Sequence, residues 1–354
     1  MEITMPKLRR IIVAILALMS YVHTTMAQEL KYGVDFMTLF DNTEYAGMET
    51  KWSETLFSAR LTPKVGLAWS EGSELVVASD FTRDFGHMVD LVSDTNLHFY
   101  YGYKAPQVRL VAGIFPRSEM RGLQSELFFD RSYRFYNNTL SGVLARKESA
   151  SGASYIEFAM DYNGKRTMTT REAFALMTSA RYAEKRLYVG YDIMIGHYAK
   201  DYSGDEKIGV VDNFLLTPYV GLQGEGYDVG IKYVQSVQRD RAHENVWECP
   251  KGVELYGALK YNKLCLSNVT YLGEAPFVYY KRYSGNRDQR LYPGLQHYAP
   301  HGKNFYEAVT LCYREYFANR SILFDVGFTI EGDGVGWGTR QWLCVSVMLD
   351  KLGR

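Results

Sequence analysis

From residue 31 onward, apolar and polar side chains alternate along successive segments of the chain. In residues 55–70, the odd positions from Phe57 to Trp69 are apolar or proline, and the even positions from Ser58 to Ser70 are polar or small. Successive side chains of a β-strand point to opposite faces, so this pattern predicts strands with one apolar and one polar face. The same alternation recurs in residues 156–162, 253–260, 322–331 and 343–349.

The alternating segments predict about 16 strands, separated by connections that are short and long in turn. The connection 71–72 is short and the connection 117–138 is long. We expect strands at residues 31–41, 55–70, 73–84, 95–104, 107–116, 139–148, 153–163, 171–184, 187–200, 213–224, 227–240, 251–261, 264–280, 304–318, 321–332 and 340–351.

The strand pattern favours a membrane barrel over a soluble β-sandwich, which would also alternate. The segments are close to the 9–11 residues that a tilted membrane strand needs. Aromatic residues gather at segment ends, as in Phe99-Tyr100-Tyr101 and Tyr279-Tyr280, where interface girdles are found. The fold class predicted is therefore all-β, a transmembrane antiparallel up-and-down β-barrel of about 16 strands.

The first 27 residues have the three parts of a secretory signal peptide. Lys7, Arg9 and Arg10 precede the apolar run 11–19, and residues 25–27 end in Met26-Ala27. The apolar run is shorter than the roughly 20 residues that a membrane-spanning helix requires. We expect a signal peptide over 1–27 and a single outer-membrane barrel domain over 28–354.

Composition gives little reason to expect a cofactor, a metal or nucleic acid. Lys plus Arg and Asp plus Glu are both 40, so no net positive charge favours a phosphate backbone. The four cysteines have no metal-ligand spacing; one disulfide is compatible with export, but unpaired small apolar residues fit the pattern better. His297 and His301 share a long loop, where solvated histidines are commoner than metal ligands. The glycine-rich residues 332–338 lack a P-loop Lys and predict a flexible external loop.

Charged side chains fall on the polar face of the predicted strands. A Lys or Arg on the lipid face costs about 2–4 kcal/mol at the membrane midplane, so these residues are expected to face the lumen. A barrel of about 16 strands is wide enough for an aqueous channel, although paired charges and Tyr side chains could also fill it. The lumen-lining candidates are Asp35, Arg60, Lys64, Arg109, Glu157, Asp161, Asp192, Lys232, Glu254, Lys260, Asp325 and Glu331.

The third long connection, residues 117–138, combines charges with the apolar run Leu127-Phe128-Phe129. Folding into the lumen would bury these aromatic rings and narrow the pore, whereas packing across the top as a lid is the alternative. This layout resembles that of general trimeric porins, so a trimer is compatible with it, and the oligomeric state stays open. The constriction candidates are Arg117, Glu119, Arg121, Glu126, Asp130, Arg131 and Arg134.

Several short motifs, taken in order, resemble a group of largely uncharacterised, porin-like outer-membrane β-barrels of the Bacteroidota. They are Phe40-Asp41-Asn42 with Glu44-Tyr45, Arg60-Leu61-Thr62-Pro63 with Val65-Gly66-Leu67, Phe115-Pro116-Arg117, Arg171-Glu172-Ala173-Phe174, Asp212-Asn213, Arg239-Asp240-Arg241, and Trp247 with Pro250-Lys251-Gly252. The resemblance implies a barrel in the outer membrane and no reaction. The C-terminal Leu352-Gly353-Arg354 departs from the aromatic end of the commonest outer-membrane barrels.

Two of these motifs also have a structural interpretation. Asp41-Asn42 can form a turn by bonding their own backbone, and Arg239-Asp240-Arg241 can connect neighbouring loops.

Three functions follow as hypotheses, with no catalytic residue assigned. The first is a porin-like channel for passive or weakly selective passage of small polar solutes, with outer-membrane lipid as the surrounding partner. The second is a closed barrel whose Tyr-rich loop, residues 280–298, binds a glycan or a protein. The third is a lipid-modifying enzyme, which requires a His and a Ser that meet near the outer rim.

Overall fold

The computed structural model describes residues 28–48, 53–70, 72–86, 92–165, 172–199, 210–280, 291–294 and 305–350. The expected signal peptide lies outside these residues. Within them the chain forms sixteen strands: β1 (Glu29–Ala46), β2 (Glu54–Trp69), β3 (Ser73–Asp84), β4 (Asp94–Ala105), β5 (Val108–Pro116), β6 (Thr139–Glu148), β7 (Tyr155–Gly164), β8 (Ala173–Glu184), β9 (Leu187–Ala199), β10 (Val210–Gly224), β11 (Tyr227–Asp240), β12 (Lys251–Tyr261), β13 (Leu264–Gly273), β14 (Phe305–Phe317), β15 (Ile322–Gly332) and β16 (Trp337–Asp350).

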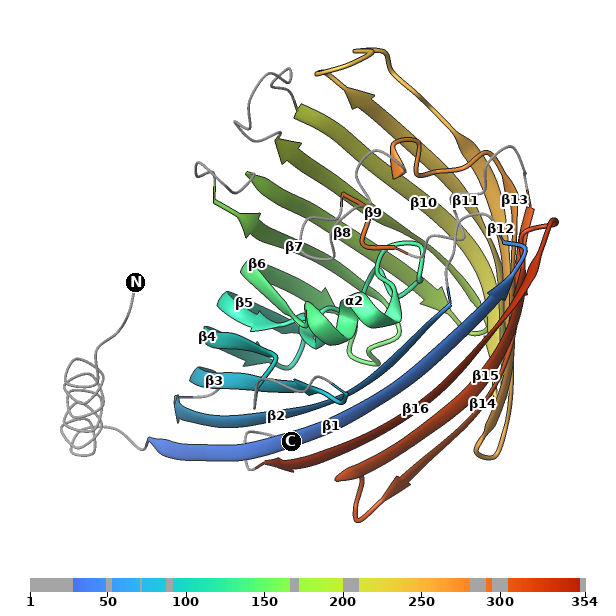
Figure 1. Cartoon of the computed structure of the whole chain (residues 1–354). Coiled ribbons are helices and arrows are strands. Elements are labelled where there is room, and N and C mark those ends of the chain that lie inside the picture. Colours follow the sequence, from blue (N-terminus) through green and yellow to red (C-terminus); the bar gives the residue numbers. More distant parts are fainter. Residues whose placement is uncertain are drawn as a thin grey trace.

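The strands form one closed barrel, in which each strand pairs antiparallel with its neighbours in sequence. The ring closes where β1 pairs with β16, in a register that runs from Gly33 opposite Asp350 to Ala46 opposite Trp337. Figure 1 shows the strands surrounding an interior that holds the short helix α2. The prediction of an all-β, antiparallel, up-and-down barrel is confirmed.

The barrel turns its apolar face outward. On β2, Phe57 and Leu61 are 47% and 43% exposed, whereas Ser58 between them is 1% exposed. Tyr261 and Trp337, at strand ends, are also exposed. Apolar side chains outside and polar side chains inside reverse the arrangement of a soluble protein and match a wall that contacts lipid.

One stretch of the outer face is polar. Asn268 and Thr270 share the face of β13 that carries the exposed Leu266 and Leu272. The Asn268 amide donates to Glu307 Oε1 on β14 at 3.2 Å, and the Thr270 hydroxyl donates to Asn268 Oδ1 at 3.1 Å. These hydrogen bonds reduce the cost of placing the three groups on an otherwise apolar surface.

Two predicted strand ends lie five or more residues from the observed ones, and side-chain pairing explains the first. Asp41-Asn42 does not form a turn, because β1 continues through it to Ala46. Asp41 accepts hydrogen bonds from Arg340 Nε and Nη2 on β16, so the neighbouring strand takes the bonds that a turn would have used. The second error is β13, which ends at Gly273 rather than at residue 280.

The long connection between β5 and β6 folds into the barrel as the inward loop, residues 117–138. It contains a 3-10 turn, η1 (Arg117–Glu119), and the helix α2 (Arg131–Tyr136). Asp130 caps α2, since its side chain accepts a hydrogen bond from the Tyr133 N–H. Neither helical element of the described chain is long and apolar enough to cross a membrane.

A second connection, between β13 and β14, covers the inward loop. The Asp130 N–H donates to the Pro293 carbonyl oxygen at 2.9 Å. Phe277 and Tyr292 stack with ring centroids 4.8 Å apart. Both belong to a buried apolar cluster that joins the inward loop to the inner faces of β5 to β11, β13 and β14, so this half of the lumen is filled at the depth of the loop.

We predict that the outward positions tolerate charge according to depth. Ile231 is 44% exposed and is the fifth residue of β11, far from both strand ends. Ile231→Lys should make the free energy of folding into bilayers less favourable by about 2–4 kcal/mol, because it buries an ammonium group in hydrocarbon. Urea titration of folding into liposomes measures this.

The matched control for that substitution is Tyr261→Lys, because Tyr261 is 76% exposed at the end of β12. Near an interface the cost should fall to about 0–1 kcal/mol. Equal costs at the two positions would contradict a lipid-facing outer surface.

Candidate functional site

A cavity of about 1250 Å³ lies between the inward loop and one side of the barrel wall. Strands β1 to β6, β15 and β16 line it on the side of the barrel wall. The helical elements η1 and α2 of the inward loop line the opposite side. It reaches the short turns that contain Ser70 and Gly72 and residues 105–108. The cavity therefore extends from the inward loop to the end of the barrel that carries the short turns.

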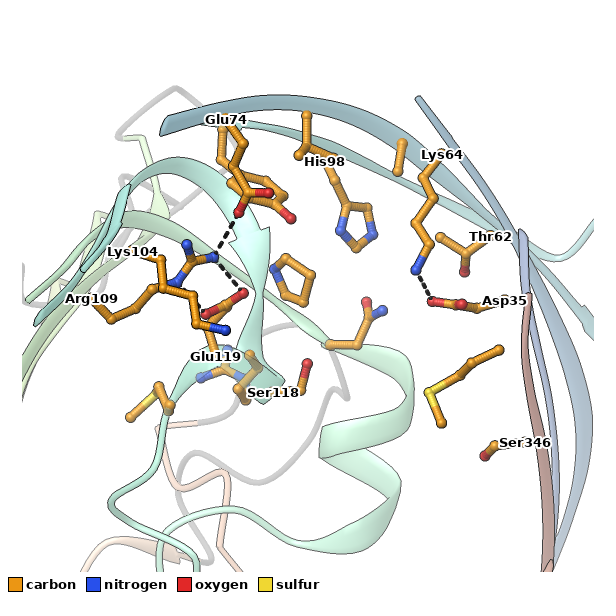
Figure 2. A pocket seen from close by; sticks show the side chains of 18 of the residues that line it. Asp35, Thr62, Lys64, Glu74, His98, Lys104, Arg109, Ser118, Glu119 and Ser346 are labelled. Atoms are coloured by element: carbon orange, nitrogen blue, oxygen red, sulfur yellow. Dashed lines mark hydrogen bonds and ion pairs between the residues drawn. The ribbon is translucent and has the colours of Figure 1, made fainter. Parts of the chain in front are cut away.

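Charged side chains of both signs line this cavity. Arg109 on β5 lies between two carboxylates, with Nη2 at 3.1 Å from Glu74 Oε1 and 2.8 Å from Glu119 Oε1. Lys64 Nζ lies 2.8 Å from Asp35 Oδ2. Figure 2 shows these three ion pairs, and it places Glu119 of the inward loop across the cavity from Asp35 and Lys64.

Lys104 adds a cation to the same cavity. It is exposed, lies beside Arg109 and Glu119 in Figure 2, and forms no ion pair with the residues that the structure describes. Its ammonium group is therefore available to solvent and to ions that enter the cavity.

Buried carboxylates on the opposite wall bind the backbone of the inward loop. Glu157 on β7 accepts hydrogen bonds from the Arg121 N–H at 3.0 Å and the Gly122 N–H at 2.9 Å. Asp192 on β9 accepts one from the Leu123 N–H at 3.0 Å. Backbone donors away from water must be paired, so these carboxylates fix the path of the loop.

Arg117 fixes the start of the loop. Its Nη2 lies 2.9 Å from Asp161 Oδ2 and also donates to the Thr139 carbonyl oxygen. Its guanidinium carbon lies 4.6 Å from the centroid of the Phe129 ring. The same arginine thereby connects β7, β6 and the aromatic part of the loop.

The far end of the loop binds the wall of the cavity. Arg60 on β2 donates to the Phe135 carbonyl oxygen, and the Tyr136 hydroxyl donates to Asp84 Oδ1 at 2.8 Å. Arg131 packs its guanidinium carbon 4.0 Å from the centroid of the Trp342 ring. The loop therefore crosses the lumen from β7 and β9 to β2, β3 and β16.

Burial and the neighbouring Arg340 lower the pKa of Arg131 from its ordinary value. Glu126, whose Oε2 lies 3.8 Å from Arg340 Nη1, acts in the opposite direction on the pKa of Arg131. The Glu126 carboxylate thus partly offsets the effect of burial on Arg131.

The predicted lumen residues fall into three groups by their contacts. Asp35, Arg60, Lys64, Arg109 and Asp325 line the cavity. Glu157, Asp161 and Asp192 bind the inward loop. The other four lie away from it: Lys232 pairs with Glu254 at 2.6 Å, Glu331 accepts hydrogen bonds from Tyr45 and Tyr306, and Lys260 is exposed near the end of β12.

The predicted constriction residues also divide. Arg117, Glu119, Arg131 and Arg134 line the cavity. Arg121 instead pairs with Glu148, Glu126 lies near Arg340, and Asp130 caps α2.

Several residues of the site were not predicted. Asp80 is fully buried and binds His98 Nε2 at 2.8 Å, and Arg146 pairs with Glu157 at 3.0 Å. Each occupies an inward position of its strand, so the alternation could have found them. The second inward segment, residues 274–280 and 291–294 between β13 and β14, had no such signal in the sequence. Its Tyr292 is 3% exposed rather than part of an external contact surface.

The remaining predictions have mixed outcomes. Arg239 and Arg241 both bind Asp212, at 3.0 and 2.6 Å, so this motif does connect the ends of neighbouring strands. The glycine-rich connection is a short turn over residues 333–336, in which Asp333 accepts hydrogen bonds from the N–H groups of Val335 and Gly336. His297 and His301 lie outside the described residues, and the described ones contain no cluster that could hold a metal.

The barrel is similar to solved structures of outer-membrane porins, which share its fold. The chain gives a TM-score of 0.54 at 12% identity with OmpT, an outer membrane protein of Vibrio cholerae solved in its trimer form, over 91% of this chain and 99% of that one. For Salmonella typhi OmpF in complex with daunomycin the values are 0.51, 8%, 90% and 97%, and for Pseudomonas aeruginosa OpdL 0.51, 11%, 91% and 99%. No family model and no curated protein matches the chain.

We predict that Glu157 holds the inward loop in place. Glu157→Gln removes a charge that binds two backbone N–H groups and Arg146, at a cost of roughly 1–3 kcal/mol. The loop should then be cut faster by trypsin at Arg121, Arg131 or Arg134, as measured by limited proteolysis of folded protein in detergent.

Asp325→Asn provides the matched control for loop release. Asp325 is an inward carboxylate that pairs with Arg314 at 2.7 Å and forms no hydrogen bond with the inward loop among the described contacts. Equal cleavage rates for both variants would contradict the anchoring role of Glu157.

Proposed function

We propose that this protein is a porin-like channel of a bacterial outer membrane that admits small polar solutes by passive, weakly selective diffusion. The observation that carries the proposal is the cavity inside a closed barrel, bounded by an inward loop and lined by charges of both signs. Its volume of about 1250 Å³ exceeds that of pockets that hold small ligands, which are about 300–1,000 Å³.

The outer surface supports membrane insertion. Exposed apolar side chains recur around the ring, from Phe36 on β1 to Leu349 on β16. A closed barrel satisfies every strand edge, which is the requirement for β-structure in hydrocarbon. The signal peptide expected over residues 1–27 agrees with export to this location.

Weak selectivity is expected from the cavity lining. Lys64 pairs with one carboxylate and Arg109 with two, whereas Lys104 forms no ion pair within the described part of the chain. Paired charges keep the cavity surface polar but create little net electrostatic potential in it. Small anions and cations should therefore both enter.

The second candidate is a closed barrel that binds a partner through its external loops. The observation that favours it is the apolar cluster, in which Leu127 and Phe128 are fully buried between the barrel wall and the second inward segment. Liposome swelling with small sugars separates the two functions, since a closed barrel gives no swelling.

The lipid-modifying enzyme lacks the His–Ser contact that it requires within the described chain. His98 and His243 bind Asp80 and Asp240, and no hydrogen bond of the described residues joins a histidine to a serine. We therefore do not propose a reaction.

We predict stepwise conductance when the folded protein enters planar lipid bilayers, and a larger step when residues 122–135 are replaced by a short Gly-Ser connection. The replacement removes the part of the loop that crosses the lumen. Folded protein that inserts but gives no conductance steps would sink the channel hypothesis.

A charge reversal in the cavity should change ion preference. Lys104→Glu replaces an exposed cation of the cavity with an anion, so the reversal potential across a salt gradient should shift toward cation selectivity. Lys185→Glu, in the short turn between β8 and β9 and outside the cavity lining, is the control and should leave it unchanged. The same shift in both variants would mean that the cavity does not carry the current.

A further inference from the structure

Two cysteines that lie far apart in the sequence are directly opposite each other in the barrel. Cys265 on β13 pairs in register with Cys312 on β14. Both are partly buried, and neither forms a disulfide in the structure. Antiparallel strands hold such opposite residues at a fixed separation, so the two side chains are permanent neighbours in the folded barrel.

The two thiols point to the same side of the wall. Leu264 and Leu266, which flank Cys265, are each 46% exposed on the outer face, and Leu311 beside Cys312 is 51% exposed there. Side chains alternate along a strand, so both cysteines face the lumen. Cys265 is the second residue of β13, and the pair therefore lies close to the short-turn end of the barrel.

The backbone register gives the two Cα atoms of this pair a separation that lies within the range found in disulfides. The Arg314 N–H donates to the Lys263 carbonyl oxygen at 2.9 Å, which makes residues 263 and 314 a hydrogen-bonded pair. Pair types alternate along an antiparallel ladder, so Cys265 and Cys312, two positions away, are also of this type. Opposite Cα atoms of such pairs are about 5.5 Å apart, within the roughly 4.4–6.8 Å range of disulfides.

We propose that Cys265 and Cys312 are oxidised to a disulfide after export, a modification that rests on the proposed location outside the cytoplasm. One thiolate attacks a protein or small-molecule disulfide and forms a mixed disulfide with it. The second thiolate then attacks the cysteine sulfur of this mixed disulfide and displaces the remaining half of the oxidant as a thiolate. An S–S bond forms between β13 and β14, the two cysteines lose two electrons and two protons, and the oxidant is released as two thiols. No other oxidant is required.

The bond would close the connection that carries the second inward segment. Residues 274–304 lie between β13 and β14, and they include Phe277 and Tyr292 of the buried cluster. A disulfide between β13 and β14 closes this connection into a loop and lowers its conformational entropy in the unfolded chain. It would therefore stabilise the strands that hold the second inward segment against the inward loop.

The test uses full-length protein isolated from cell envelopes with free thiols alkylated at lysis. Tryptic digestion without reductant should yield the peptide of residues 264–281 joined to that of residues 304–314, with loss of two hydrogens. Addition of reductant should separate the two peptides. Recovery of both peptides alkylated on cysteine in the unreduced sample overturns the proposal.

A series of cysteine variants tests whether the effect of reductant comes from this pair. In Cys249→Ser/Cys344→Ser protein only the proposed pair remains, and reductant should lower its midpoint of thermal unfolding. The further substitution Cys265→Ser should abolish this sensitivity, whereas an unchanged response to reductant would overturn the assignment. Bilayer conductance of the same samples is measured separately, so an inactive channel with an intact disulfide counts against the proposed function alone.

Discussion

The structure depends on the closure of its backbone hydrogen bonds into a ring. β1 pairs with β16 over fourteen register positions, which leaves no free strand edge between them. In hydrocarbon an unpaired N–H or carbonyl group costs several kcal/mol, so a sheet can cross a membrane only when it is closed. The outward apolar belt and the inward polar face follow from this, because each strand then has one side toward lipid and one toward the lumen.

Inside the closed barrel, the irregular inward loop also needs partners for its backbone hydrogen-bonding groups. The inward loop has backbone donors without strand partners, and Glu157 and Asp192 accept three of them. Buried carboxylates need hydrogen bonds as much as the loop does, so each satisfies the other. The charges of β7 and β9 are therefore structural in the half of the lumen where the loop is attached.

The loop divides the lumen into two unlike parts. Towards β5–β11, β13 and β14 it buries an apolar cluster, whereas towards β1–β6, β15 and β16 it borders a polar cavity, so that β5 and β6 contribute to both. Arg109 faces the cavity and also binds Glu119 of the inward loop. The same side chain therefore lines the cavity and helps to hold the loop that bounds it. Solute passage and loop anchoring are thus expected to be coupled at these ion pairs.

The sequence by itself determined the strands and the direction of their faces. Alternation around Phe57 and Ser58 is enough to assign inside and outside, because the side-chain period of a strand is two. It also placed Arg117 and Glu119 in a connection that combines apolar and charged residues. Residues 108–115 carried a further signal, since Val111 and Phe115 are apolar on the inward face of β5 and form part of the buried cluster.

Only the tertiary structure decided which inward charges meet. Asp41 and Arg340 are separated by almost the whole chain and come together because the first and last strands pair. The burial of Tyr292 and the juxtaposition of Cys265 with Cys312 likewise depend on contacts between distant segments. Local periodicity reports the face of a residue but carries no information on its partner, because the partner is set by the register and closure of the ring.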